Sequence, residues 1–161
     1  LRQDLVELDR RVAELDGEIQ TAAKADETAG RLQSIPGIGP ITATALVASV
    51  GDGRQFKRGR ELAAWLGLTP GQHSSGGKDR LLGISKRGDT YLRTLLIHGA
   101  RSVIRTAANK TDPRSRWISA VAARRNPNVA AVALANKNAR IAWAVLTQGG
   151  RYDSQYGMAA A

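Results

Sequence analysis

The first 29 residues carry apolar side chains at alternating intervals of four and three positions. This spacing is the a/d seam of a coiled coil, and it predicts a helix of about 28 residues and about 42 Å. A seam this narrow needs a partner helix, either from another copy of the chain or from an upstream helix that folds back. An amphipathic helix lying on its own domain is the alternative. The seam consists of Leu1, Leu5, Leu8, Val12, Leu15, Ile19 and Ala22.

From residue 30 onward, stretches of helical spacing alternate with short breaks marked by glycine and proline. Alternating strand patterns are essentially missing, so the expected fold is mainly α, with a compact helical domain after the N-terminal helix. Asp89 or Thr90, Asp112 and Asn126 are the expected N-caps of the three longer helices. The predicted helices cover residues 31–34, 41–50, 61–66, 90–108, 113–125 and 127–149.

These patterns divide the chain into three segments. Residues 1–29 are the predicted coiled-coil segment, residues 30–150 the helical domain, and residues 151–161 a flexible tail. Within the domain, residues 71–88 are rich in glycine and basic residues and have no stable period. The chain opens on Leu1 and shows no signal peptide, so we expect it to be a fragment of a longer protein.

Charge is distributed unevenly along the chain. Its 24 Lys and Arg against 14 Asp and Glu give a formal net charge of +10. Residues 1–29 hold four bases and eight acids, so residues 30–161 hold 20 bases and six acids. A basic body of this kind is typical of nucleic-acid binding. Charge that serves only solubility is the alternative, and the segregation of the charge disfavours it.

Composition excludes several other classes of protein. The chain has no cysteine, which excludes disulfide frameworks, zinc knuckles and thiol nucleophiles and fits a reducing cytosol. The longest apolar run, residues 129–135, is too short to cross a bilayer. Binding to an anionic membrane surface is disfavoured by an aromatic content of only 4%. We therefore expect no membrane partner.

Two glycines one residue apart, bracketed by prolines, form a predicted hairpin at residues 36–40. This is the pattern of a helix-hairpin-helix element. Gly37 and Gly39 would let the backbone approach a phosphate, toward which the first amides of the following helix point. Such an element holds a DNA backbone without reading its sequence. A plain turn between two packed helices is the alternative.

The glycine-rich stretch combines hydroxyl groups with cations. Ser74 and Ser75 precede two glycines, and a serine that attacks a phosphodiester would keep the broken strand attached to the protein. Nearby cations and backbone amides would stabilise the developing phosphorane. A flexible surface loop is the alternative. The cations are Lys78, Arg80, Lys86 and Arg87.

Beyond this stretch, the predicted helix 90–108 carries Arg93, Arg101 and Arg105 within an arc of about 120°. On the surface, this stripe would follow a phosphate backbone, and a solvated face is the equal alternative. In the last helix, Trp143 is expected in the core. The six acids after residue 29 are scattered, and no pair at metal-ligand spacing is evident.

Five motifs follow one another within residues 30–148. They are IPGIGP at 35–40, LAAWLGLTP at 62–70, SGGK at 75–78, GISKRGD at 83–89 and ANKNAR at 135–140. This order resembles the C-terminal transposase domain of the insertion-sequence-110 family, relatives of the Piv DNA invertase. The N-terminal seam is similar in position to the coiled coil that joins this domain to an upstream domain in the family.

The resemblance implies a recombinase that cuts and rejoins DNA under the direction of a bridge RNA. It places the serine nucleophile at Ser75, with Ser74 as the fallback because the two are adjacent. It also implies an upstream RuvC-like domain whose acids bind metal, so Mg²⁺ is expected there, no cofactor is expected in this fragment, and the isolated fragment is expected to be inactive. The expected partners are DNA, guide RNA and a second copy bound through the coiled coil, in the bacterial cytoplasm at the nucleoid.

Two other functions stay open from the residues alone. The chain is a non-catalytic nucleic-acid-binding module if the hairpin and the basic residues only hold DNA or RNA. It is an assembly scaffold if the coiled coil is its main feature and the basic charge is incidental.

Overall fold

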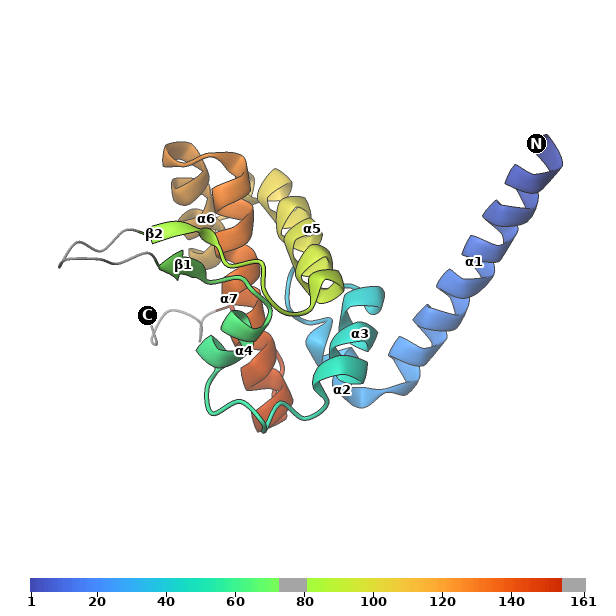
Figure 1. Cartoon of the computed structure of the whole chain (residues 1–161), viewed down its shortest axis with the longest axis horizontal. Helices are drawn as coiled ribbons and strands as arrows, with labels where there is room; N and C mark the ends of the chain where they lie inside the picture. Colours follow the sequence, from blue (N-terminus) through green and yellow to red (C-terminus); the bar gives the residue numbers. More distant parts are fainter. Residues whose placement is uncertain (73–80, 155–161) are drawn as a thin grey trace.

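The computed structural model describes residues 1–72 and 81–154, and it is mainly helical as the sequence predicts (Figure 1). α7 runs through the centre of the body and contacts α2, α4, α5 and α6, whereas α1 extends away from the body (Figure 1). The elements are α1 (Arg2–Ala25), α2 (Glu27–Leu32), α3 (Pro40–Val50), α4 (Gly59–Trp65), β1 (Pro70–Gln72), β2 (Leu81–Ile84), α5 (Thr90–Ala107), α6 (Pro113–Arg124) and α7 (Pro127–Gln148).

The N-terminal helix ends earlier than its pattern predicts. Asp26 has an extended backbone, with φ −94° and ψ 114°, and its carboxylate accepts a hydrogen bond from the Ala29 N–H at 2.9 Å. This cap begins α2 and turns the chain there. The predicted continuous helix of about 28 residues is therefore wrong in its last turn. The predicted short helix at 31–34 is the end of α2 followed by a turn.

The three later helices begin where the sequence predicts, because each start is fixed by a side chain close in sequence. Asp89, rather than Thr90, caps α5 by accepting from the Leu92 N–H, Asp112 caps α6, and Asn126 caps α7. Pro113 and Pro127 occupy the first helical positions of α6 and α7, where a missing N–H costs nothing. Gly149 ends α7 in the left-handed conformation.

The sequence reasoning missed a two-stranded antiparallel sheet within the glycine-rich stretch. Pro70 pairs with Ile84, and Gln72 pairs with Leu81, with an irregularity in the register between the two pairs. Strands of three and four residues are too short to show an alternating pattern, and their pairing depends on the whole connecting segment. Residues 73–80, which connect the strands, lie outside the described residues.

The core lies where one face of α7 meets α4 and α5. Small residues on α7, among them Ala131, Ala135 and Ala139, are fully buried and let the neighbouring helices approach closely. Trp143 is only partly buried, yet it packs against the core, and its indole N–H donates to the carbonyl oxygens of Gly53 and Phe56. None of the described helices combines the length and apolar character needed to cross a membrane.

A contact between two glycines joins the turn after α2 to the middle of α5. A Cβ on Gly99 would overlap the carbonyl oxygen of Gly37, and a Cβ on Gly37 would lie 2.9 Å from the carbonyl oxygen of Gly99. Both neighbouring atoms belong to the backbone, so neither can move aside without shifting a helix or the turn.

We therefore expect Gly99→Ala to lower the free energy of unfolding by about 2 kcal/mol, because the added methyl group must push the turn away from α5. Urea denaturation measures the change. Gly30→Ala is the matched control, since its Cβ meets nothing within 4 Å and alanine favours the helix. Equal unfolding midpoints for the two variants would contradict this close approach.

Candidate nucleic-acid interface

The turn between α2 and α3 is built by proline and glycine and held by buried polar side chains. Pro36 precedes Gly37, whose φ of +93° suits glycine, and the Ile38 N–H donates to the Ile35 carbonyl oxygen at 3.0 Å. The carbonyl oxygen of Pro36 accepts hydrogen bonds from Arg114 and from Asn138, each at 3.1 Å. Side chains from α6 and α7 thus fix the backbone of this turn.

The two glycines of the turn, Gly37 and Gly39, have different structural roles. Gly37 faces α5 through its contact with Gly99, so its lack of a side chain serves packing inside the protein. Gly39 is the N-cap residue of α3, with Pro40 as the first helical residue, and a Cβ placed on it would meet nothing within 4 Å. Of the two, only Gly39 leaves the space that the predicted approach of a phosphate requires.

The predicted nucleophile and two of its cations fall outside the described residues. Ser74, Ser75, Lys78 and Arg80 all belong to residues 73–80, which connect β1 to β2. The pairing continues past the strands on the described side, where the Ser85 N–H donates to the Thr69 carbonyl oxygen at 2.9 Å. The sheet therefore fixes where the segment with both serines leaves the body and returns to it.

Lys86 and Arg87 lie at the base of this hairpin with exposed side chains. The Lys86 N–H donates to the Gly67 carbonyl oxygen at 3.2 Å, and Lys86 has a φ of +55°, which is uncommon for a residue other than glycine. These contacts hold the turn that follows β2 against the end of α4.

The expectation that Arg93 shares a surface stripe with Arg101 and Arg105 is wrong for Arg93. Its side chain is only 7% exposed. The guanidinium donates to the carbonyl oxygens of Leu66 and Arg87, at 3.1 and 3.2 Å, and to the Thr90 hydroxyl. Because Leu66 ends α4, its carbonyl lies at the negative end of that helix and favours the buried cation. Arg93 therefore joins α4, α5 and the turn at Arg87.

Arg101 and Arg105 are exposed on α5 as predicted. Arg101 donates to the side-chain carbonyl of Asn128 at 3.0 Å, which joins the surface of α5 to the first turn of α7. Their role in binding nucleic acid stays a prediction.

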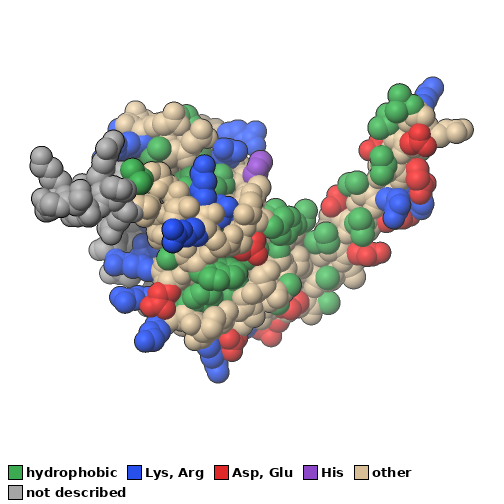
Figure 2. Space-filling view, viewed as in Figure 1, with side chains coloured by type: hydrophobic (Ala, Val, Ile, Leu, Met, Phe, Trp, Pro, Cys, Tyr) green, Lys and Arg blue, Asp and Glu red, His purple; other side chains and the backbone are tan. Residues whose placement is uncertain are grey.

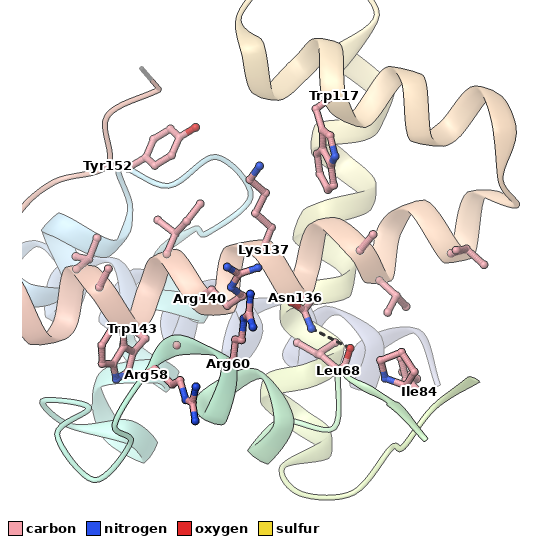
Figure 3. A pocket seen from close by; sticks show the side chains of 18 of the residues that line it. Arg58, Arg60, Leu68, Ile84, Trp117, Asn136, Lys137, Arg140, Trp143 and Tyr152 are labelled. Carbon is pink, nitrogen blue, oxygen red and sulfur yellow. Dashed lines mark hydrogen bonds between the residues drawn. The ribbon is translucent and has the colours of Figure 1, made fainter. Parts of the chain in front are cut away.

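A groove of about 1230 Å³ lies along α7, and the sequence reasoning did not find it (Figure 3). α4 and the β1–β2 hairpin border it on one side, and α6 and the segment after α7 border it on the other. Asn136 at its centre donates to the Leu68 carbonyl oxygen at 3.1 Å, which joins α7 to the segment between α4 and β1. Its cationic lining residues are Arg58, Arg60, Lys137, Arg140 and Arg151.

Positive charges crowd one another in this groove. The ammonium group of Lys137 lies 4.5 Å from the centre of the Trp117 ring. Burial lowers the pKa of Lys137 below its usual value, and repulsion by the Arg114 and Arg140 guanidinium groups lowers it further. Lys137 and Arg140 are three positions apart on one helical face, a spacing that the sequence displays. No such signal links them to Arg58 and Arg60, which come from a distant segment.

Residues suited to holding a metal ion do not gather in the part of the chain that the structure describes. Within residues 1–72 and 81–154, no three His, Cys, Asp or Glu side chains form a group that fits a metal ion. Asp89 and Asp112 instead cap helices, and Glu61 accepts a hydrogen bond from the Lys57 N–H at 2.8 Å. These residues do not fit a Mg²⁺ site of converging carboxylates.

Comparison with known proteins agrees with the motif series. The profile of the transposase IS116/IS110/IS902 family matches residues 29–116, and the chain belongs to this family. A probable family 20 transposase of Pseudomonas aeruginosa is 60% identical over 148 residues, which cover 92% of this chain and 44% of the relative. The transposase for insertion sequence element IS1111A of Coxiella burnetii is 54% identical over 148 residues, covering 92% of this chain and 41% of the relative. The chain thus spans less than half the length of these relatives.

We expect Arg93→Gln to lower the melting temperature by about 5 °C, because the carbonyl oxygens of Leu66 and Arg87 would lose their buried donor. Arg101→Gln removes the same charge from an exposed site on the same helix and should leave the melting temperature nearly unchanged. Thermal unfolding followed by circular dichroism compares the two variants. Equal melting temperatures would show that the contacts of Arg93 do not support the fold.

Proposed function

We propose that this chain is the part of a bacterial transposase that binds DNA and a guide RNA and supplies the serine that cuts the DNA strand. The observation that carries the proposal is the antiparallel pairing of β1 with β2. This pairing anchors both ends of the segment with Ser74 and Ser75 on a basic body, in a chain of a transposase family. The similarity to a probable family 20 transposase and to the transposase for insertion sequence element IS1111A supports a role in transposition.

In the proposed reaction, the hydroxyl oxygen of Ser75 attacks a phosphodiester phosphorus and loses its proton. A bond forms between the serine oxygen and phosphorus, the bond from phosphorus to one sugar oxygen breaks, and that sugar leaves as a hydroxyl after taking up a proton. The strand stays joined to the protein, so the reverse attack by a sugar hydroxyl reseals DNA without another energy source. Ser74 is the alternative nucleophile.

The cations near the serine segment would stabilise charge on the phosphorane. Lys86 and Arg87 have exposed side chains at the base of the hairpin, and Lys78 and Arg80 belong to the segment itself. Arg93 contributes indirectly, because its hydrogen bond to the Arg87 carbonyl holds the turn in place. The family resemblance implies that Mg²⁺ would bind in the upstream part of the transposase.

The turn before α3 would hold the DNA backbone beside this site. Gly39 leaves room at the first amides of α3, where the helix dipole favours a phosphate group. This is the role of a helix-hairpin-helix element, and it is independent of base sequence. Arg101 and Arg105 would add phosphate contacts along α5, which make the affinity dependent on salt.

The N-terminal helix would join two copies of the chain as a coiled coil. α1 extends away from the body, and its seam residues Leu5, Leu8, Val12 and Leu15 are each more than half exposed. Pairing two such helices would bury these side chains. It would also bring two serine segments into one assembly.

We expect Ser75→Ala to abolish the covalent protein–DNA adduct while DNA binding is retained, because the alanine lacks the attacking oxygen. The full-length transposase with DNA and guide RNA provides the assay, with adducts separated on denaturing gels. Ser74→Ala is the matched control and should keep the adduct. An adduct lost only in Ser74→Ala would move the nucleophile to Ser74. A full-length protein that binds DNA but forms no adduct would support the non-catalytic binding module.

We expect Leu8→Asn together with Leu15→Asn to convert a dimer of this chain into a monomer, since both residues lie on the seam. Sedimentation velocity measures the change. Val6→Asn is the control, because Val6 is 64% exposed on the same helix but lies off the seam. A dimer that survives the double substitution would place the contact elsewhere.

A further inference from the structure

The groove along α7 is lined by both apolar side chains and cations. Its volume of about 1230 Å³ exceeds the range of about 300–1000 Å³ that is usual for small-molecule sites, so an extended ligand suits it better. Val132 and Ile141 of α7, together with Leu68 and Ile84, supply apolar surface. Leu82 and Val129 are about half exposed at its edge, 49% and 52%.

Cations outnumber acids at the groove. Among the described residues that line it, Asp153 is the one acid beside five cations, and Arg58 pairs with Glu61 at 3.4 Å. Lys137 is partly buried beside Arg114 and Arg140, which repel it. A fold that holds like charges together at some cost favours a ligand with several negative charges.

The groove also has aromatic side chains at its border. Trp117 and Tyr152 lie on one side of α7, across from Arg58 and Arg60 on the other (Figure 3). Proteins that bind a single nucleic-acid strand combine a cationic groove with aromatic and apolar surface, because each nucleotide carries a phosphate and a flat base. The cations of this groove suit the phosphate of a nucleotide, and its apolar and aromatic side chains suit the base.

We propose that this groove binds a single DNA strand, with phosphates at Arg60, Lys137 and Arg140 and unpaired bases against the apolar side chains that line it. A duplex is disfavoured because its bases are stacked inside and cannot reach those side chains. Pro70 and Ile84, which pair across β1 and β2, line one end of the groove. The strand would thus run toward the hairpin that carries Ser75, and to this extent the inference rests on the proposed function.

The groove could instead receive an acidic amphipathic helix, such as the N-terminal segment of another copy. Residues 1–29 carry eight acids and an apolar seam, which would also complement a groove lined by cations and apolar side chains. The single strand is favoured because Pro70 and Ile84 of the paired strands line the groove, and the segment that joins these strands holds the proposed nucleophile. The seam of α1, in contrast, suits another helix like itself. The helix is therefore a rival outcome of the test.

The test is binding of the 161-residue chain to a labelled DNA strand of about 16 nucleotides, followed by fluorescence anisotropy at several salt concentrations. Lys137→Gln with Arg140→Gln should weaken binding at least about tenfold and reduce the slope of log affinity against log salt by about 1.4. Arg2→Gln with Arg11→Gln removes the same charge from α1 and is the matched control. It should change neither quantity appreciably.

A second variant tests the apolar lining of the groove separately. Leu82→Ser with Val129→Ser changes two exposed positions, so the fold should persist, and circular dichroism checks it. Loss of base contacts should weaken strand binding about tenfold but leave the affinity for the matching duplex nearly unchanged. An RNA strand of the same sequence, bound more tightly than DNA and equally sensitive to these variants, would overturn the assignment to DNA.

Two further results would overturn the proposal. One is equal strand affinity for the groove variant and the α1 control. The other is displacement of the strand by a peptide of residues 1–29, which would assign the groove to a helix. Ser75→Ala should bind the strand normally, so failure of the cleavage chemistry and failure of the groove proposal give different results.

Discussion

The carbonyl oxygen of Pro36 joins three parts of the chain that are distant in sequence: the turn before α3, α6 and α7. It accepts hydrogen bonds from Arg114 of α6 and Asn138 of α7, and these two side chains also bond to each other. Arg114 is 4% exposed and lies under the Tyr152 ring, so losing an acceptor there would leave a buried charge without compensation. This network fixes the turn that presses Gly37 against α5, and with it the start of α3. The placement of the proposed phosphate contact thus depends on residues about 80 to 100 positions away.

The way the acidic side chains are used explains why much positive charge stays on the surface. The buried guanidinium groups of Arg93 and Arg114 donate hydrogen bonds to carbonyl oxygens rather than to carboxylates. The carboxylates of Asp89 and Asp112 are used to cap helices, where they satisfy backbone N–H groups. Figure 2 shows Lys and Arg side chains over the helical body. Because the acids serve the backbone, folding leaves most of these cations available to a polyanion.

The features of the fold that the sequence could predict are those fixed by interactions between residues close together in sequence. Asp112 with Pro113, and Asn126 with Pro127, mark helix starts because a cap acts within three residues. The exposure of Arg93 could not be predicted, since helical spacing gives its face but not that the end of α4 covers it. The groove was missed for the same reason: Lys137 and Arg140 are neighbours on α7, but Arg60 reaches them only through packing of α4. The motif series nevertheless identified the family, because it depends on order along the chain and not on contacts.

The acids of residues 1–29 and the bases of the following domain are separated along the sequence. Because α1 ends at Asp26 and the chain turns there, these charges are also separated in space. If α1 lay along the body, its acids would neutralise the cations of the proposed interface. Asp26 ends α1 and caps α2 instead, and the 24 residues of α1 span about 36 Å leading away from the body (Figure 1). Electrostatic effects in physiological salt fade over about 8 Å, so only the acids of its last turns influence the body. The acidic helix and the basic domain can therefore meet different partners at the same time.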